Sequence, residues 1–209
     1  VDVRVYPATW LEGTIDPPSS KNYTTRYLLA AALAEGESII HHPAVSEDSQ
    51  ALQRCLEALG AELKPEGDRL RVKGFGRRPR NPGTLNPGNA GAVLRFLMGV
   101  CAVTLPKVTF VTDYAESLGK RPHGDLLAAL EQLGVKSRSR EGKLPITLEG
   151  GSVRGGTVQV SGAISSQFVT ALLFAAPLIG EEVIIEVTGE MKSRPPIRQT
   201  LQVLSEAGI

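Results

Sequence analysis

Cysteine and histidine are scarce in this chain of 209 residues, which contains two of the first and three of the second. Cys55 and Cys101 lie in apolar helical patterns without a metal-ligand spacing, so we expect buried thiols in a reducing compartment. His41, His42 and His123 also lack such a spacing, and we expect them at the surface or at strand ends. These residues predict no metal site.

Long apolar runs and an excess of charge of one sign are missing too. No run reaches the about 18 apolar residues of a membrane span, and we find no secretory signal. A net charge of +1 gives no general attraction to nucleic acid or to an anionic membrane, so any anion site has to be local. We therefore expect a cytoplasmic protein that binds neither nucleic acid nor membrane.

Nucleotide-binding and hydrolase motifs are absent as well. No Gly-x-Gly-x-x-Gly follows a predicted strand, and there is neither a Walker loop nor a Gly-x-Ser-x-Gly elbow. The sequence therefore gives no support to nucleotide binding or to serine hydrolysis.

The chain does contain a block that occurs three times, at 55–61, 129–135 and 203–209. Each block is typical of the end of an amphipathic helix followed by glycine, and the glycines at 60, 134 and 208 are 74 residues apart. Strand-like sequence follows the first two blocks, whereas the chain stops after the third. We therefore expect part of a longer protein that is built from repeated α/β units.

Each unit has the same order of predicted elements. A polar loop opens an apolar helix, a strand and a second helix follow, and a hairpin closes the first two units. The expected first helices are 26–34, 92–103 and 168–176, the strands are 38–42, 107–112 and 182–188, the second helices are 47–59, 122–133 and 195–207, and the hairpins turn near 66–68 and 141–143. This order predicts an α/β fold whose three units pack around a pseudo-threefold axis, with the most apolar helices inside.

Small residues gather in the three loops that open the first helices, at 19–21, 88–91 and 165–167. Free backbone N–H groups and the positive end of a helix favour anions, and threefold packing brings the three helix starts to one end of the domain. Basic residues cluster at the same level, namely Lys21, Arg26, Arg95, Lys120, Arg121, Lys192 and Arg194. A cation at a helix start is unfavourable by about 0.3–1 kcal/mol, so this pattern predicts bound anions.

Five ordered motifs resemble those of the 5-enolpyruvylshikimate-3-phosphate synthase family, over nearly the whole chain. They are Ser20-Lys21-Asn22-Tyr23-Thr24-Thr25-Arg26, Gly88-Asn89-Ala90-Gly91 with Arg95, Arg121-Pro122, Ser165-Ser166-Gln167-Phe168 and Ser193-Arg194-Pro195. The similarity corresponds to the N-terminal half of that family's enzyme. It implies two domains, each an inside-out α/β barrel of three pseudo-symmetric βαβαββ units, with the active site in the cleft between them.

The resemblance also implies a division of this chain. Residues 1–11 are expected to be a crossover segment that pairs with the missing second domain. Residues 12–209 are expected to form the N-terminal enolpyruvyl transferase domain, with units at about 12–76, 77–150 and 151–209, the third one truncated.

The family transfers the enolpyruvyl group of phosphoenolpyruvate to the 5-hydroxyl of shikimate 3-phosphate and releases phosphate, on the way to chorismate and the aromatic amino acids. It uses no metal or organic cofactor, and the herbicide glyphosate competes for the phosphoenolpyruvate site. The expected partners are therefore the two small-molecule substrates and the missing C-terminal half. Because that half supplies the acid–base carboxylates, we expect this fragment alone to lack turnover.

A role for each motif residue follows from the resemblance alone. Shikimate 3-phosphate is expected at Lys21, Asn22, Arg26, Ser165, Ser166, Gln167 and Ser193, with Arg26 on its carboxylate. Phosphoenolpyruvate is expected at Lys21, Asn89, Gly91, Arg121 and Gln167. The catalytic residues are expected to be Lys21, Arg121 and Gln167. The chain departs from the usual pattern at Ser19, Asn22, Thr25, Ala92 and Pro196, where glycine, serine, asparagine, threonine and tyrosine are common.

Two other interpretations remain open. UDP-N-acetylglucosamine enolpyruvyl transferases share this fold and have a pair like Lys21-Asn22, but they usually carry a cysteine before their Arg-Pro pair, and residues 113–120 contain none. The other alternative is a non-catalytic binding module of the same fold.

Overall fold

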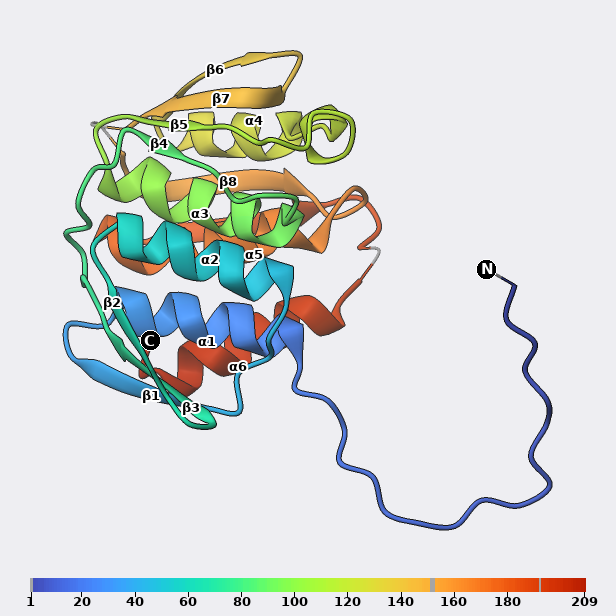
Figure 1. Ribbon diagram of the computed structural model, residues 1–209. Helices are drawn as coiled ribbons and strands as arrows, with labels where there is room; N and C mark the ends of the chain where they lie inside the picture. Colours follow the sequence, from blue (N-terminus) through green and yellow to red (C-terminus); the bar gives the residue numbers. More distant parts are fainter. Residues whose placement is uncertain (1, 151–152, 192) are drawn as a thin grey trace.

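A computed structural model describes residues 2–150, 153–191 and 193–209 as an α/β fold (Figure 1). Four residues lie outside the described part of the chain: Val1, Gly151, Ser152 and Lys192. Three predictions fall partly on them, namely the segment 1–11, the unit 151–209 and the basic cluster that includes Lys192. The helices are α1 (Lys21–Leu33), α2 (Glu47–Ala58), α3 (Gly91–Thr104), α4 (Gly124–Gln132), α5 (Ser166–Ile179) and α6 (Pro195–Glu206), with a 3-10 turn η1 (Leu118–Lys120). The strands are β1 (Glu37–His41), β2 (Glu62–Glu66), β3 (Arg69–Lys73), β4 (Thr84–Leu85), β5 (Val108–Phe110), β6 (Lys136–Arg140), β7 (Lys143–Glu149), β8 (Gly156–Ser161) and β9 (Val183–Thr188).

These strands form three separate sheets around the helices. The first has the order β1-β3-β2 and is antiparallel, the second has the order β4-β5-β7-β6, and the third pairs β8 with β9 in parallel. The predicted hairpins are confirmed, since β2 and β3 turn at Gly67 and β6 and β7 turn at Gly142, both with the positive φ that glycine adopts most easily. Figure 1 shows β1–β3 and β6–β7 at opposite ends of the helical layer.

Helices α3 and α5 form the centre of the fold, as their apolar sequences predict, and α1 packs mainly on α2 and α6. α3 is buried along most of its surface, and it packs mainly on α5. The contact is close because Gly99 faces the backbone of Ala171: a Cβ on Gly99 would lie 2.3 Å from the Ala171 carbonyl oxygen. Around this point the Phe96 and Phe174 rings lie 5.9 Å apart, within the range of a favourable aromatic pair.

The outer helices bury one stripe and expose the other side. In α2 this stripe includes Ala51, Leu52, Cys55 and Leu56, and Ser46 begins the helix with a capping box.

Cys55 and Cys101 are both buried, which confirms the expected burial of the two thiols. The basic connector after the first unit is also tied to α2, because Arg80 donates hydrogen bonds to the carbonyls of Glu57 and Ala58 at its C-terminal end.

Some expectations were wrong in detail. α1 begins at Lys21 rather than at residue 26, because Ser20 caps it, and α5 continues to Ile179 rather than ending at 176. Parallel strands β4 and β8 open the second and third units, whereas no described residue before α1 belongs to a strand, so the first unit lacks its expected opening strand. His123 is fully buried instead of lying at the surface, because it caps α4 beneath the β6–β7 turn; its backbone N–H donates to Gly142 at 2.8 Å.

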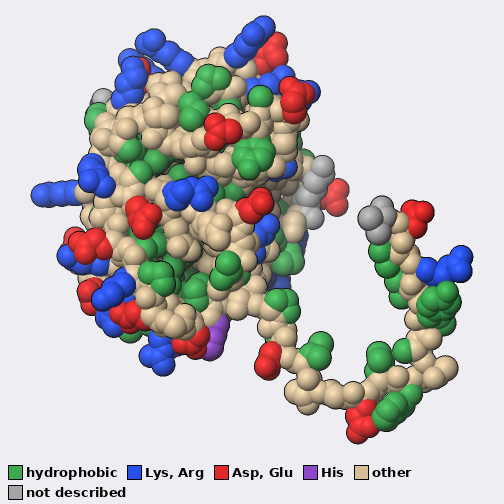
Figure 2. Space-filling model, in the orientation of Figure 1, with side chains coloured by type: hydrophobic (Ala, Val, Ile, Leu, Met, Phe, Trp, Pro, Cys, Tyr) green, Lys and Arg blue, Asp and Glu red, His purple; other side chains and the backbone are tan. Residues whose placement is uncertain are grey.

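The N-terminal segment, residues 2–20, extends away from the helical body without helix or strand (Figures 1 and 2). Its apolar side chains are exposed, namely Val3, Val5, Tyr6, Trp10, Leu11 and Ile15. Its pairing with a second domain stays a prediction. In the described part of the chain, no helix is long and apolar enough to cross a membrane.

Gly99→Ala should destabilise the fold, because the new Cβ would meet the backbone of Ala171 and the central helices would have to separate. Overpacking of this kind costs about 1–3 kcal/mol, and each kcal/mol lowers the melting temperature by about 2–4 °C in a chain of this size. Thermal unfolding followed by circular dichroism measures the effect. Gly36→Ala is the control, since its Cβ would meet nothing within 4 Å. Equal melting temperatures for the two variants would contradict the close α3–α5 contact.

Candidate functional site

The starts of the three central helices lie together, as the repeat predicts. Ser20 caps α1 by accepting a hydrogen bond from the N–H of Tyr23, Ser165 caps α5 by accepting one from Gln167, and α3 begins at Gly91 without any side-chain cap. None of the three helices has an acidic residue in its first turn. The positive ends of the helix dipoles are therefore left uncompensated, which favours an anion at this place.

A cavity of about 300 Å³ opens between these helix starts. It is lined by Lys21, Asn22, Thr25, Asp48, Asn89, Gly91, Ala92, Arg121 and Gln167. Six of the predicted site residues are thus brought to one place, from four separate segments of the chain: Lys21, Asn22, Asn89, Gly91, Arg121 and Gln167. Two cations, one carboxylate and several amide groups suit a ligand with more than one negative charge.

Asp48 is a site residue that the sequence did not reveal. Its carboxylate lies 3.1 Å from the Lys21 ammonium and is the partner that fixes the direction of that side chain. Asp48 stands in the first turn of α2, where an acidic residue usually just complements the helix dipole. The sequence around Asp48 looks like that of any acidic residue in the first turn of a helix. The packing of α2 beside α1 is what brings the Asp48 and Lys21 side chains together.

Arg95 and Arg121 converge on Gly91. A Cβ built on Gly91 would lie 2.9 Å from Nη1 of Arg121 and 3.5 Å from Nη1 of Arg95. Arg95 donates a hydrogen bond to the side-chain oxygen of Gln167 and stacks on the ring of Phe168, 5.2 Å from its centroid. Burial lowers the pKa of Arg95 to about 10, and repulsion from Arg121 acts in the same direction. Arg95 therefore remains charged near pH 7, and the absence of a side chain at Gly91 leaves room for both guanidinium groups.

Arg26 lies outside the cavity and is 2% exposed. Its guanidinium donates hydrogen bonds to the Asn22 carbonyl at 2.8 Å, the Thr200 hydroxyl at 2.8 Å and the Pro196 carbonyl at 3.1 Å, and it lies 5.1 Å from the centroid of the Phe96 ring. Burial lowers its pKa to about 10. Arg26 joins α1 to α6 in this structure, and three of its five N–H donors are used in doing so.

The predicted serines also lie outside the cavity lining. Ser165 and Ser166 are half-buried at the start of α5, directly before Gln167, and the Ser165 hydroxyl is engaged in capping that helix. Ser193 is half-buried before α6. The structure thus brings the first two serines to the same helix start as the cavity, without making them part of its wall.

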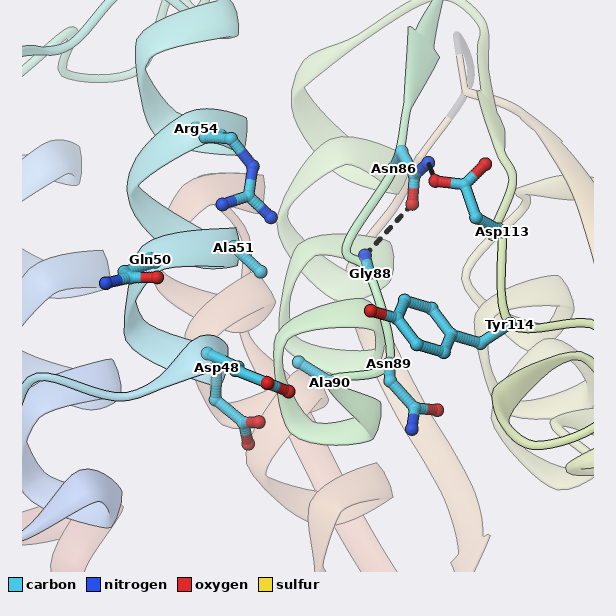
Figure 3. Close-up of a pocket in the computed structure, with 11 residues that line it drawn as sticks. Asp48, Gln50, Ala51, Arg54, Asn86, Gly88, Asn89, Ala90, Asp113 and Tyr114 are labelled. Carbon is cyan, nitrogen blue, oxygen red and sulfur yellow. Dashed lines mark hydrogen bonds between the residues drawn. The ribbon is translucent and has the colours of Figure 1, made fainter.

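A second cavity, of about 320 Å³, adjoins the first (Figure 3). The two cavities share Asp48 and Asn89. Figure 3 shows how the loop before α3 is held: the Asn86 side chain accepts a hydrogen bond from the Gly88 N–H at 3.0 Å and donates one to Asp113 at 2.8 Å. This Asx-type turn fixes the direction in which the chain enters α3, and with it the position of Asn89.

Among the described residues, no three His, Cys, Asp or Glu side chains lie close enough together to hold a metal ion. What the site offers is charge and hydrogen-bond donors. Such a group of preorganised donors can bind anions and stabilise negative charge that develops on them.

The comparisons with known proteins agree on one family. The family model of EPSP synthase (3-phosphoshikimate 1-carboxyvinyltransferase) matches residues 5–209. A curated 3-phosphoshikimate 1-carboxyvinyltransferase from Deinococcus radiodurans is 55% identical over 208 residues, which cover 100% of this chain and 47% of that protein. One from Methanococcoides burtonii is 40% identical over 201 residues, or 95% of this chain and 46% of that protein.

A solved structure agrees at the level of the fold. The EPSP synthase from Acinetobacter baumannii superposes with a TM-score of 0.79 at 21% sequence identity, over 91% of this chain and 42% of that chain. The chain therefore has an α/β fold like that of EPSP synthase, and it spans about half the length of the curated relatives it matches.

Gly91→Ala should weaken anion binding without unfolding the protein, because the new methyl group displaces only the flexible end of the Arg121 side chain. Loss of one charge-assisted hydrogen bond, about 1.5–3 kcal/mol, corresponds to at least a tenfold weaker affinity. Calorimetric titration with inorganic phosphate measures it. Gly124→Ala is the matched control, since Gly124 also begins a helix and its Cβ would meet nothing within 4 Å. Unchanged affinity in Gly91→Ala, or an equal loss in both variants, would show that Arg121 does not bind the anion.

Proposed function

The chain belongs to the EPSP synthase family, and we propose that it forms half of an enzyme that moves the enolpyruvyl group of phosphoenolpyruvate to the 5-hydroxyl of shikimate 3-phosphate. One observation supports this most directly: three helix starts without acidic residues open on a single cavity together with Lys21 and Arg121. Both substrates carry several negative charges, and this arrangement suits them.

In this proposal phosphoenolpyruvate lies against Lys21, Asn89, Gly91, Arg121 and Gln167, all of which line the cavity. The reaction breaks the bond between the enolpyruvyl carbon and the phosphate oxygen, and the shikimate hydroxyl oxygen takes its place on that carbon. The hydroxyl proton is removed as the new bond forms, and one proton ends on the released phosphate. The released phosphate gains negative charge in this step. Lys21 and Arg121 stabilise that charge from fixed positions, and Gln167, oriented by Arg95, contacts both substrates.

Shikimate 3-phosphate is assigned to Lys21, Asn22, Arg26, Ser165, Ser166, Gln167 and Ser193. The serine hydroxyls at the start of α5 and before α6 receive its phosphate group. Arg26 reaches the carboxylate with the two N–H donors that its internal hydrogen bonds leave over. About four charge-assisted contacts of 1.5–3 kcal/mol each approach the roughly −8 kcal/mol of a micromolar ligand before the costs of binding.

We further propose the finer division of the fold into three pseudo-symmetric βαβαββ units, at about 12–76, 77–150 and 151–209, arranged as an inside-out barrel. The support is that hairpins β2–β3 and β6–β7 close two of the sheets, while among the described residues β8 and β9 pair only with each other. Chain outside this sequence would complete the third unit, the second domain and the partner of residues 1–11. The exposed apolar side chains of residues 2–15 fit such a partner.

The acid–base groups of the reaction belong to that second half in this proposal, so the present chain alone binds substrate without turnover. A cytoplasmic location is proposed as well, since both cysteines are buried and unpaired.

A pair of substitutions in the full-length protein tests the assignment of the two substrates. Arg121→Ala should raise the KM for phosphoenolpyruvate at least tenfold and leave the affinity for shikimate 3-phosphate within about twofold, because one charge-assisted contact is worth about 1.5–3 kcal/mol. Steady-state kinetics, with direct calorimetry for shikimate 3-phosphate, provides both values. An equal effect on both substrates would count against the role of Arg121.

Ser166→Ala should have the opposite pattern. It should lower the affinity for shikimate 3-phosphate by about fivefold to tenfold, because one hydrogen bond contributes about 1 kcal/mol. The substitution leaves the Ser165 cap of α5 in place, so the helix start is preserved. The same calorimetric titration measures it, with Arg121→Ala as the matched comparison. Wild-type affinity in Ser166→Ala would remove this serine from the phosphate site.

A further inference from the structure

Asp48 places a negative charge in the cavity between the helix starts, whose other features favour anions. It lines this anion cavity together with Lys21 and Arg121, and its Oδ2 atom lies 3.1 Å from Nζ of Lys21. A carboxylate at this place opposes the binding of an anionic ligand. Glu47, in the same first turn of α2, also complements the helix dipole without lining the anion cavity. The dipole of α2 therefore does not explain why Asp48 faces the cavity.

The start of α2 is fixed to α1, and the backbone of Asp48 is fixed with it. Thr24 of α1 is buried, and its hydroxyl accepts a hydrogen bond from the Ala44 N–H at 2.9 Å. Ser49 is fully buried, and its hydroxyl donates to the Ala44 carbonyl at 2.7 Å and takes part in the capping box of α2. Asp48 therefore holds its carboxylate beside Lys21 from a rigid element.

The Lys21 side chain is flexible by comparison, since it is 53% exposed and Asp48 is its one ion-pair partner in the described part of the chain. Lys21 lines the anion cavity alone, whereas Asp48 lines the adjoining cavity too. The adjoining cavity is acidic, because its lining contains Glu47, Asp48 and Asp113 against one cation, Arg54. Without its ion pair, the Lys21 ammonium has many rotamers to sample, including those directed toward these carboxylates and away from the anion cavity.

We propose that Asp48 is a positioning residue for the transfer reaction, holding the Lys21 ammonium over the anion cavity while the released phosphate gains negative charge. This inference rests on the proposed function, in which Lys21 contacts both substrates. An ion pair with this exposure adds little to the stability of the fold, so its effect is on the direction of Lys21. A cation that is already in place stabilises developing charge without reorganisation. Loss of Asp48 should therefore affect the reaction step more than substrate binding.

Steady-state kinetics of the full-length protein tests this difference with Asp48→Asn, which keeps the size of the side chain and removes its charge. The kcat should fall by about tenfold or more, because Lys21 is no longer held in place. The KM for phosphoenolpyruvate should stay the same or fall, because a repelling carboxylate has left the anion cavity. A higher KM with an unchanged kcat would overturn the inference.

Glu47→Gln is the matched control, since it removes the neighbouring acid of the same helical turn, which lines the adjoining cavity alone. Its kcat should stay within about twofold of the wild type, as expected for a surface substitution. An equal loss of kcat in Glu47→Gln and Asp48→Asn would assign the effect to the charge of α2 in general, against a specific role of Asp48.

A double substitution shows whether Asp48 acts through Lys21. In the Lys21→Met background, Asp48→Asn should have almost no further effect on kcat, because the group that it positions is gone. If the effects of the two single substitutions multiply in the double variant, Asp48 does not act through Lys21 and the inference is wrong.

Nuclear magnetic resonance relaxation of the lysine ammonium groups measures the positioning itself, and it also decides the matter if Lys21→Met leaves no measurable kcat. The 209-residue chain suffices for it, with the Lys21 signal assigned by its loss in Lys21→Met. The order parameter of this side chain should be lower in Asp48→Asn than in the wild type and unchanged in Glu47→Gln. Equal order in the wild type and Asp48→Asn would overturn the inference.

The outcomes separate this inference from the proposed function. If the full-length protein converts phosphoenolpyruvate and shikimate 3-phosphate but Asp48→Asn behaves like Glu47→Gln, the inference is wrong and the proposed function stands. If the full-length wild type does not convert these substrates, the proposed function is wrong and the inference falls with it.

Discussion

The close contact of α3 with α5 is the constraint on which the site depends. Because Gly99 has no side chain, the two helices approach until its Cα faces the Ala171 carbonyl, and their starts come to the same level. Arg95 of α3 can then reach Gln167 of α5. The apolar surface that α3 and α5 bury on each other stabilises this arrangement, so the geometry of a polar site is fixed by the packing of an apolar core.

The cavity has an excess of positive charge, since Lys21 and Arg121 line it together with one acidic residue, Asp48. Helix starts usually have acidic residues or side-chain caps, yet α1, α3 and α5 have no acidic residue in the first turn, and α3 has no cap. Among the described residues that line the cavity, Asp48 is the one acid, and its carboxylate pairs with Lys21. The remaining positive charge suits the anionic ligands proposed above. If anions bind there as proposed, they would stabilise the folded state through linkage.

The chain belongs to the EPSP synthase family and spans about half the length of its curated relatives. Two features of its surface are consistent with this shorter length. The cavity between the helix starts is lined mainly by polar residues, and the apolar residues before α1 are exposed. Exposed apolar residues of this kind fit the proposed contact with chain outside this sequence. The residues that line the cavity stand on elements that pack within this chain, so the anion binding proposed for them can be measured on the chain itself.

The sequence by itself determined the type and order of most elements and the grouping of three helix starts, because hydrophobic period, helix caps and glycine turns are local properties. The 74-residue repeat predicted that the loops of Lys21, Asn89 and Ser166 come together. Lys21 and Asn89 line one cavity with Gln167, whereas Ser166 stands beside Gln167 without lining it. Only the tertiary structure decided that Asp48 pairs with Lys21, that Arg26 bonds to α6, and that His123 is fully buried at the start of α4. These features depend on residues from different elements. The local sequence around an acidic residue, an arginine or a histidine is the same whether or not a distant part of the chain packs against it.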